Sequence, residues 1–291
     1  MAGNSPTPAP TASASAMNVI AALLEQRTGQ QIAANRAWRI ETALKPLLRE
    51  KQLASLDALV AQLVLSRSPE LGEAVVDALL NQETSFFRDA AVIEMVAAAA
   101  IAMQAEAGGR RLRIWSAGCS NGQEPLSLAM LLHENGLFDG PTAPEIIGTD
   151  ISPAALARAR AARYSQFEIQ RGLPVRRMVE WFEPAGNDWA ARPELVRRIQ
   201  FRPHNLVVDP APSGRFDIVL CRNVLLYFSL PLRQRVFDMM AQAIRPGGLL
   251  VLGAGETVIG QTSHFRPSEQ YRGLYVAGSA AERSAAAGLP A

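Results

Sequence analysis

The segment Ile114-Trp-Ser-Ala-Gly-Cys-Ser-Asn-Gly-Gln-Glu-Pro-Leu-Ser-Leu-Ala-Met130 joins an apolar strand to an amphipathic helix through a turn with glycines at 118 and 122. Glycine permits a sharp turn and lets a ligand come close to the backbone. Glu124 and Pro125 open the helix, whose free N–H groups point in the same direction as the turn. The segment predicts a nucleotide-binding loop, although a glycine pair in this position is also compatible with a simple tight turn.

A second feature further along the chain agrees with the first. Glu145-Ile-Ile-Gly-Thr-Asp150 has the pattern of a short buried strand that ends in an acid, and Ser152 then begins a helix. Doubly wound nucleotide-binding folds use an acid at the end of the second strand to accept the ribose hydroxyls. The alternative role of Asp150 is to cap the helix, but Ser152 suits that role better. Asp150 is therefore a candidate ribose ligand.

Composition limits the classes of protein that fit. The chain has 291 residues, 48% of them hydrophobic, which is enough for one α/β domain and a smaller second domain. Its net charge of +2 gives no indication of a nucleic-acid partner or a polybasic membrane anchor. Neither a membrane-spanning run nor a signal peptide is evident, so we expect a cytoplasmic protein without membrane insertion.

The N-terminal part divides by composition and periodicity. Residues 1–16 and 278–291 are rich in Pro, Ala, Ser or Thr and are predicted to be disordered tails, and Met17 is an alternative translation start. Removal of the first tail is therefore expected to leave stability and activity unchanged. Residues 17–82 repeat apolar residues at helical spacing and predict a small all-α domain of four helices. Residues 83–107 form a linker and an Ala-rich helix.

Residues 108–277 alternate strand and helix patterns. The predicted strands are 111–117, 145–149, 199–203, 215–221 and 247–253, the helices are 124–135, 152–163 and 231–244, and 261–266 with 271–276 form an edge hairpin. This alternation predicts an α/β fold with a doubly wound, mainly parallel sheet covered on both faces. Residues 165–198 interrupt the pattern and predict a small insertion subdomain, a place where α/β enzymes often bind partners.

Five segments together resemble the CheR family of chemotaxis-receptor methyltransferases in order and spacing. They are Thr84-Ser-Phe-Phe-Arg-Asp89, Cys119-Ser-Asn-Gly-Gln-Glu-Pro125, Thr149-Asp-Ile151, Asn205-Leu206 and Cys221-Arg-Asn-Val-Leu-Leu-Tyr-Phe228. The resemblance implies a class I fold that uses S-adenosyl-L-methionine (SAM). It also implies methyl-ester formation on glutamate side chains in the cytoplasmic signalling domain of chemoreceptors, with S-adenosyl-L-homocysteine as the product.

The same resemblance assigns the cofactor ligands. It implies that Glu124 holds the methionyl amine, that Asp150 holds the ribose, and that Asn205 and Leu206 flank the adenine. These residue types suit the roles, since a carboxylate pairs with an ammonium and an amide beside an apolar side chain can read a purine. A strand-ending turn is the alternative for Asn205 and Leu206. The remaining expected cofactor contacts are Gln82, Thr84, Arg88, Gly118, Gly122, Cys221 and Arg222.

Methyl transfer to a carboxylate needs positioning rather than a general base, because the carboxylate is already an anion at neutral pH. The expected catalytic residues are Arg88 and Arg222, which draw in the glutamate, and Tyr227, which aligns one of its oxygens. A tight bidentate clamp would quench the nucleophile, so a looser contact is expected. The alternatives for Arg88 are a surface ion pair with Asp89 or a helix-terminal charge, and the alternative for Tyr227 is a core position beside Phe228.

The chain departs from the family pattern at a few positions. Asn121, Gln123 and Leu126 stand where family members commonly have Thr, Glu and Tyr, and Gln82 replaces an Asn. These changes are mostly between polar residues, so they bear on the affinity for the cofactor more than on its identity.

Two other functions remain open from the residues. One is a SAM methyltransferase that acts on another carboxylate or protein, since a fold does not determine a substrate. The other is a catalytically idle SAM-binding adaptor, which would need neither Arg88, Arg222 nor Tyr227. A NAD-dependent oxidoreductase is disfavoured because the loop lacks the third glycine of the dinucleotide fingerprint. No metal site is expected, because the histidines lack partners at ligand spacing.

The insertion also bears on partner docking. Family members that bind a receptor's C-terminal peptide tether carry a longer, glycine-richer loop than residues 183–195, which hold one glycine and two prolines. Proline lacks the donor that strand addition requires. We therefore expect no pentapeptide tether, with Arg158, Arg160 and Arg163 as candidate contacts to an acidic receptor helix. A solvated helix face is the alternative reading of these arginines.

Overall fold

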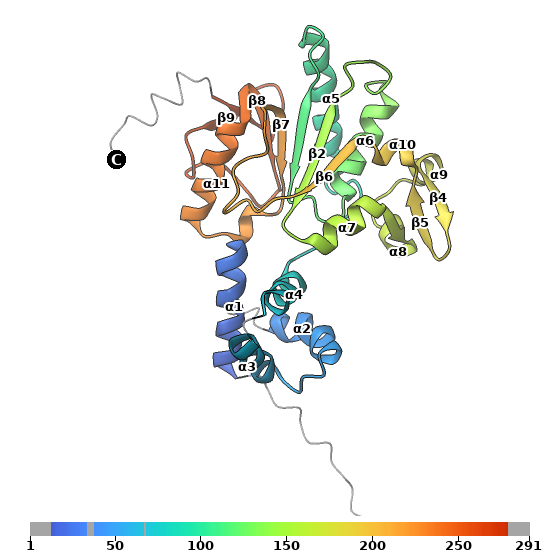
Figure 1. Ribbon diagram of the computed structural model, residues 1–291. Coiled ribbons are helices and arrows are strands. Elements are labelled where there is room, and N and C mark those ends of the chain that lie inside the picture. Colours follow the sequence, from blue (N-terminus) through green and yellow to red (C-terminus); the bar gives the residue numbers. More distant parts are fainter. Residues whose placement is uncertain (1–12, 34–37, 67, 279–291) are drawn as a thin grey trace, which may run out of the picture. The chain divides into compact units, whose positions relative to one another are not determined.

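The computed structural model describes residues 13–33, 38–66 and 68–278, and its contacts divide the chain into two compact units, Met1–Asn81 and Gln82–Ala291 (Figure 1). The division lies one residue before the boundary predicted after residue 82. Most of the two predicted tails lies outside the described residues.

The smaller unit contains α1 (Ala14–Thr28), α2 (Trp38–Glu50), α3 (Leu56–Ser66) and α4 (Pro69–Leu79). Their buried apolar residues recur at helical spacing and form the core of this unit, as with Ile20, Leu24 and Leu44, each at most 1% exposed. Helix α1 ends at Thr28 and α3 ends at Ser66, which leaves four helices in the described part of this unit, as the sequence predicts.

The first helix begins earlier than the sequence indicates. The Ser13 hydroxyl accepts a hydrogen bond from the Ala16 N–H at 3.1 Å and caps α1, which starts at Ala14. Ala16 is only 4% exposed. The expectation of a disordered tail up to residue 16 is therefore wrong for residues 13–16, because a serine cap stabilises a helical turn that composition alone does not reveal.

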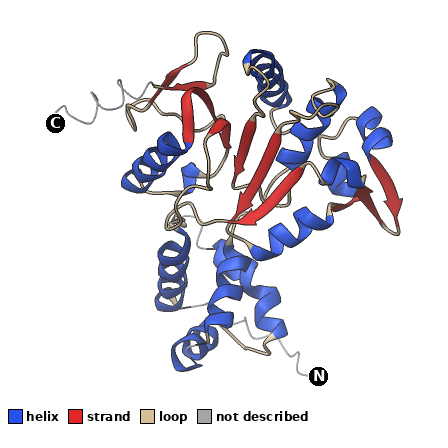
Figure 2. Ribbon diagram, turned by 45° about the horizontal axis from the view of Figure 1, so that its top comes forward, coloured by secondary structure: helices blue, strands red, loops and turns tan. Residues whose placement is uncertain are grey.

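The larger unit is built on a sheet, whose strands are among those drawn in red in Figure 2. Its strand order is β6-β2-β1-β7-β8-β10-β9. Its strands are β1 (Arg113–Ala117), β2 (Glu145–Asp150), β6 (Ile199–Pro203), β7 (Phe216–Cys221), β8 (Ile244–Leu252), β9 (Phe265–Pro267) and β10 (Tyr275–Ala277). The first five are parallel, and β10 pairs antiparallel with β8 and with β9. The predicted mainly parallel sheet with an antiparallel edge is confirmed.

The position of β1 determines where a ligand can lie. From β1 the chain adds β2 and β6 on one side of the sheet, and later adds β7 and β8 on the other side. The turn with Gly118 and Gly122 follows β1 directly, so it lies at the point where the strand order reverses. Ligands of doubly wound folds bind at this point, outside the carboxyl ends of the strands.

Consecutive strand residues pack on opposite faces of the sheet. Ile114 and Ile146 join one buried cluster, whereas their neighbours Trp115 and Ile147 join the other. The helices that complete these layers are α5 (Ala90–Glu106), α6 (Gln123–Glu134), α7 (Pro153–Ala161) and α11 (Leu230–Ala243). Two-sided burial explains why the strands have continuous apolar runs rather than alternating ones.

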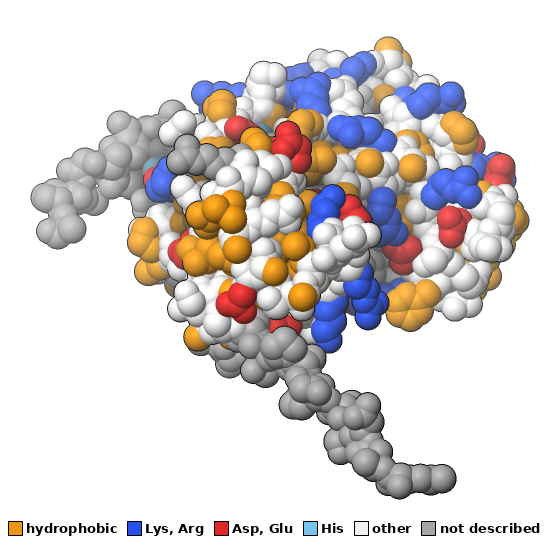
Figure 3. All heavy atoms as spheres, turned by 60° about the horizontal axis from the view of Figure 1, so that its bottom comes forward, with side chains coloured by type: hydrophobic (Ala, Val, Ile, Leu, Met, Phe, Trp, Pro, Cys, Tyr) orange, Lys and Arg blue, Asp and Glu red, His pale blue; other side chains and the backbone are white. Residues whose placement is uncertain are grey.

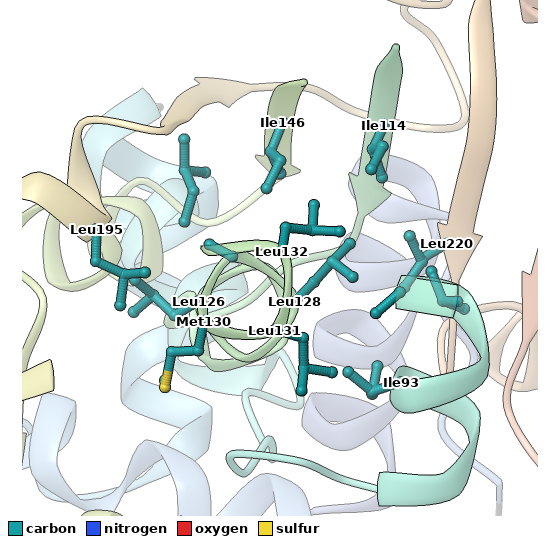
Figure 4. Close-up of a cluster of buried hydrophobic side chains, with 14 of the residues drawn as sticks. Ile93, Ile114, Leu126, Leu128, Met130, Leu131, Leu132, Ile146, Leu195 and Leu220 are labelled. Atoms are coloured by element: carbon teal, nitrogen blue, oxygen red, sulfur yellow. The ribbon is translucent and has the colours of Figure 1, made fainter. Parts of the chain in front are cut away.

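Helix α6, which follows the glycine turn, is buried over most of its length. Figure 4 shows its side chains pointing toward the sheet residues Ile114 and Ile146, toward Ile93 of α5 and toward Leu195. A helix surrounded by apolar groups cannot easily shift along its axis, because its interdigitated side chains would have to repack. The N-terminus of α6 is therefore held firmly beside the carboxyl end of β1.

The insertion forms a subdomain of its own. It contains β3 (Arg163–Ser165), α8 (Gln166–Gln170), α9 (Val175–Trp181), β4 (Phe182–Ala185), β5 (Asp188–Ala191) and α10 (Pro193–Val196), with the antiparallel strand order β3-β5-β4. Trp181 and Phe182 are buried, whereas Phe167 is exposed. The sequence predicts the insertion but not its strands, which are too short to give a periodic signal.

The three arginines proposed as receptor contacts have partners within this subdomain and its neighbours. Arg158 pairs with Glu168 at 2.7 Å, Arg160 donates to the Phe201 carbonyl at 3.0 Å, and Arg163 donates to the Ala185 carbonyl at 2.6 Å. These internal bonds give no support to their role as receptor contacts.

On the face shown in Figure 3, basic, acidic and hydrophobic side chains all reach the surface.

We predict that removal of residues 1–16 lowers the melting temperature, whereas removal of residues 1–12 does not. The longer deletion removes the Ser13 cap, a type of interaction that contributes about 1 kcal/mol, together with the buried Ala16. The shorter deletion keeps every described residue and serves as the control. Thermal denaturation followed by circular dichroism measures the difference, and equal melting temperatures would contradict the capping role.

Candidate functional site

The site begins at the glycine turn between β1 and α6. Gly118 and Gly122 have φ angles of 73° and 89°, in the left-handed region that favours glycine. A Cβ atom on Gly118 would lie 2.5 Å from Cγ2 of Val224, and one on Gly122 would lie 3.0 Å from Cβ of Ala159. The N–H groups of Gly118 and Cys119 both donate to the Thr149 carbonyl at 2.8 Å. These bonds attach the turn to the end of β2.

Asp150, at the carboxyl end of β2, faces the same turn and is 8% exposed. One of its carboxylate oxygens accepts the Ser120 N–H at 2.8 Å, and the other accepts the Ser152 N–H at 2.9 Å. Ser152 itself caps α7, as the sequence predicts. Asp150 is therefore oriented by the turn that follows β1, and its carboxylate lies where a doubly wound fold places the ribose.

A buried cation lies on the other side of the turn. The Arg222 side chain, at the end of β7, is 2% exposed and pairs with Glu124 at 3.0 Å and with Asp89 at 2.5 Å. It also donates to the Arg88 carbonyl at 2.9 Å. Glu124 in turn accepts the Ser116 hydroxyl at 2.8 Å. Arg222 thus links the linker before α5, the first turn of α6 and the end of β7.

This geometry changes the interpretation of Arg222. The sequence suggests an arginine that draws in the substrate, but both terminal nitrogens of its guanidinium already bond to Glu124, Asp89 and the Arg88 carbonyl. Its Nε atom is buried and has no hydrogen-bond partner among the described residues. Because a buried guanidinium donor without an acceptor is costly, this atom is a position where a ligand oxygen would fit.

The linker segment that carries Arg88 is held in a strained backbone conformation. Phe87 and Asp89, on either side of Arg88, have φ angles of 49° and 54°, which non-glycine residues rarely adopt. The Phe86 ring packs edge-on against Tyr164 and Phe182, with centroids 4.9 and 5.4 Å away. Such strain persists only where surrounding packing enforces it, so the position of Arg88 is determined by its neighbours.

The Arg88 side chain itself is half-buried, and its Nη1 donates to the Glu83 carbonyl at 3.3 Å. Asp89 pairs with Arg222 rather than with Arg88, which argues against the surface ion pair considered from the sequence. Earlier in the linker, Gln82 accepts the Ser120 hydroxyl through its side-chain oxygen at 2.8 Å. Thr84, which lies between Gln82 and Arg88 in the sequence, is half-buried. The linker therefore reaches the glycine turn.

Asn205 and Leu206 follow β6 and lie in a turn. The side-chain oxygen of Asn205 accepts the Val207 N–H at 3.0 Å, and its own N–H donates to Asp209 at 2.7 Å. The His204 N–H donates to the Asp150 carbonyl at 3.0 Å, which places the turn beside the ribose candidate. Asn205 therefore does form the strand-ending turn considered as the alternative, and this turn lies at the carboxyl edge of the parallel strands.

Cys221 is the last residue of β7, and Tyr227 belongs to the segment that follows it. Tyr227 lies in the short 3-10 helix η2 (Leu225–Tyr227), is half-buried and packs against the apolar cluster on the α11 side. Cys119 and Cys221 are both buried free thiols. Burial raises the pKa of each thiol well above its ordinary value, so both remain protonated at neutral pH and neither serves as a nucleophile.

The structure thus brings most of the predicted residues to one edge of the sheet. Those gathered around the glycine turn by hydrogen bonds or ion pairs are Gln82, Gly118, Gly122, Glu124, Asp150 and Arg222. Arg88, Cys221 and Tyr227 lie on the segments that border this group, and Asn205 and Leu206 lie in the turn beside Asp150.

Sequence reasoning missed several residues of this region. Ser116 and Asp89 fix the ion pairs, and the Tyr164 hydroxyl donates to the Asn121 carbonyl in the glycine turn at 2.7 Å. Asp89 directly follows Arg88, so its adjacency to a candidate was a usable signal. Ser116 and Tyr164 carry no local signal, because their partners lie on other elements.

Across 13–33, 38–66 and 68–278, His, Cys, Asp and Glu side chains form no group of three or more that could hold a metal ion. In the same part of the chain, none of the helices has the length and apolar character needed to cross a membrane.

Comparison with known proteins identifies the family. Residues 82–274 match the family described as "CheR methyltransferase, SAM binding domain". The chain is 35% identical to "Chemotaxis protein methyltransferase Cher2" of Pseudomonas putida, over 84% of this chain and 90% of that protein. It is 38% identical to "Chemotaxis protein methyltransferase" of Vibrio parahaemolyticus, over 83% and 89%.

Among solved structures, the chain is similar to a TehB-like SAM-dependent methyltransferase from Corynebacterium glutamicum. That similarity has a TM-score of 0.37 at 16% identity and covers 64% of this chain and 85% of the other. The family match spans both the linker with Arg88 and the sheet edge with Asp150 and Arg222. With its class I strand order and the SAM-binding domain that this match covers, the chain belongs to the CheR methyltransferase family.

Proposed function

We propose that this protein transfers the methyl group of SAM to glutamate side chains in the signalling domain of chemoreceptors and forms methyl esters there. The observation that carries the proposal is the convergence, within the family match at 82–274, of Arg88, Asp150 and the Glu124–Arg222 pair at the switch point of the sheet. We expect the protein to act in the cytoplasm, where the signalling domains lie.

The residues at this edge fit SAM in charge and in hydrogen-bonding groups. Asp150 is an oriented carboxylate for the ribose hydroxyls, and the turn with Asn205 and Leu206 is the candidate surface for the adenine. Asp89 and Glu124 place two negative charges on the single positive charge of Arg222. This group of three carries one net negative charge, which an ammonium such as the methionyl amine would balance. The buried Nε of Arg222 would suit a ligand oxygen.

When bound, SAM supplies an electrophilic methyl group on a positively charged sulfur. A glutamate carboxylate is ionised at neutral pH, so the protein needs no base to activate it. What the protein can contribute is alignment of the carboxylate with the methyl group, and orientation of this kind is worth up to roughly 7–11 kcal/mol of a barrier.

In the proposed assignment, Arg88 and Tyr227 share the alignment. Arg88 is half-buried and its guanidinium bonds to a backbone carbonyl rather than to a carboxylate, so it can exchange that bond for a loose contact with the incoming glutamate. Tyr227 lies on the opposite bordering segment and would align one carboxylate oxygen. Arg222 acts by holding Glu124 and Asp89 in position, and not as a substrate clamp.

We also propose that the receptor docks without a C-terminal peptide tether. At the end of the hairpin formed by β4 and β5, the Arg192 N–H donates to the Trp181 carbonyl. Hydrogen-bonded pairs alternate with non-hydrogen-bonded pairs in an antiparallel ladder. In the register of this hairpin, Phe182 and Pro184 therefore direct their backbone groups away from β5. The Phe182 N–H already donates to the Met178 carbonyl, and Pro184 has no N–H. This edge therefore offers an added strand no donor at either position.

The cofactor assignment predicts a ligand-specific thermal shift. SAM and S-adenosyl-L-homocysteine should each raise the melting temperature, whereas NAD should not. At a hundredfold excess over Kd, either ligand should add about 2.7 kcal/mol to the free energy of unfolding. In Asp150→Asn, the shift between the ligand-free and ligand-bound variant should be smaller than in the wild type, since the substitution weakens the ribose contact. Asp139→Asn, at an exposed position, is the control. A shift with NAD alone, or a full shift in Asp150→Asn, would contradict the assignment.

The catalytic assignment predicts that Arg88→Ala lowers turnover by about 100-fold, a typical cost of a misplaced reacting group. The fold should persist, because the guanidinium bonds only weakly to the Glu83 carbonyl. Arg235→Ala, at an exposed position on α11, should retain full activity. The assay incubates labelled SAM with a purified receptor signalling domain and measures base-labile methanol. Full activity of Arg88→Ala would show that our role for Arg88 is wrong.

The docking proposal predicts that an isolated receptor C-terminal pentapeptide does not bind. Isothermal titration calorimetry should detect binding to the intact signalling domain alone, because the β4 edge lacks available donors. A signalling domain truncated by its last five residues should bind as tightly as the full one. Micromolar affinity for the pentapeptide would overturn the proposal.

A further inference from the structure

The segment that carries Arg222 and Tyr227 is held by a residue that no sequence motif indicated. Glu256 lies after β8, where a turn closed by its N–H donating to the Gly253 carbonyl at 3.0 Å points it back toward the sheet. Its carboxylate accepts four backbone N–H groups. One oxygen bonds Asn223 and Gly253, both at 2.8 Å, and the other bonds Val224 at 3.0 Å and Leu226 at 3.2 Å.

These bonds satisfy donors that the segment cannot satisfy by itself. Asn223 has a φ angle of 60°, outside any regular structure, Val224 directly precedes a single turn of 3-10 helix, and Leu226 is the second residue of that turn. N–H groups at a helix start have no intrahelical acceptor. One carboxylate that accepts several of them fixes the path of the backbone between Arg222 and Tyr227, since hydrogen bonds to an ionised acceptor are stronger than neutral ones.

The backbone carbonyl groups of the same segment are bound by a cation. Nε of Arg233, on α11, donates to the Phe228 carbonyl at 2.9 Å, and its Nη2 lies 3.5 Å from the Leu226 carbonyl. Glu256 thus binds the N–H groups at the start of the segment, and Arg233 binds the carbonyl groups at its end. The two side chains come from different elements, so the segment is clamped from both sides.

The segment also contacts the glycine turn between β1 and α6. The Val224 side chain occupies the space in which a Cβ atom on Gly118 would lie, so it covers the glycine turn. The hydrogen bond from the Val224 N–H to the Glu256 carboxylate therefore fixes the residue that covers this turn. A shift of this segment would move Arg222, Val224 and Tyr227 together, because they share one short stretch of backbone.

We infer that Glu256 is a positioning residue for methyl transfer: its carboxylate holds the 222–228 segment so that Tyr227 and the Arg222 ion pairs keep their places. The inference rests on the proposed function of that segment. It assigns Glu256 no contact with SAM or with the glutamate substrate.

The test is Glu256→Gln, compared with Glu269→Gln at an exposed position. A glutamine has one acceptor oxygen, and its amide nitrogen would face two of the N–H groups that the carboxylate binds. We expect kcat to fall by about 10- to 100-fold at saturating SAM and receptor, as for a displaced reacting group. The Kd for S-adenosyl-L-homocysteine should change by less than the fall in kcat, because Asp150 and the adenine turn are untouched.

A second readout separates positioning from general stability. Amide hydrogen exchange should accelerate at Asn223, Val224 and Leu226 in Glu256→Gln while the strand amides of β1 and β2 stay protected. Glu256→Asp, which keeps the charge with a shorter reach, should recover part of kcat. If Glu256→Gln is too unstable to assay, Glu256→Asp must by itself show a lowered kcat with near-normal affinity for S-adenosyl-L-homocysteine.

The outcomes are distinguishable. An inactive wild-type protein would contradict the proposed function. An active wild type with Glu256→Gln at full kcat, or with kcat lost only in proportion to lost folded protein, would overturn the inference for Glu256.

Discussion

The buried guanidinium of Arg222 is the interaction on which the rest of the site depends. A cation that is 2% exposed is tolerable only when its charge is balanced, and here Asp89 and Glu124 supply that balance. Each carboxylate belongs to a different element, one before α5 and one in the first turn of α6. Loss of either partner would remove a hydrogen-bond acceptor of this buried guanidinium, so the linker, α6 and the end of β7 are constrained together.

Backbone strain gathers around the same place. Phe87, Asp89, Ser120 and Asn223 all have positive φ angles although none is a glycine. Each lies in a segment that borders the carboxyl edge of the sheet, and each segment is held by side-chain bonds or aromatic packing from elsewhere. The apolar core around α6 provides the rigid support that allows such conformations to persist. Positioning of polar groups is therefore a property of the whole α/β unit rather than of one loop.

Much of this arrangement could be predicted from local patterns. The helix 90–106, the strand 199–203 and the turn at Gly118 follow from periodicity and from glycine chemistry, which act over a few residues. Asp150 could be found because an acid at a strand end has a fixed place in a doubly wound sheet. The cap at Ser13 was missed because serine in a Pro/Ala/Ser-rich stretch looks the same whether or not a helix follows.

By itself, the sequence determined the α/β layering, the glycine turn at the switch point and the identity of the residues available there, because these depend on spacing along the chain. Only the tertiary structure decided what those residues bond to. It showed that Arg222, an expected substrate contact, is the partner of Asp89 and Glu124. It also placed Glu256 beside the 222–228 segment, from which α11 and β8 separate it along the chain. Ion pairs and backbone hydrogen bonds between distant segments leave no periodic trace, because they depend on distances that exist only once the sheet has formed.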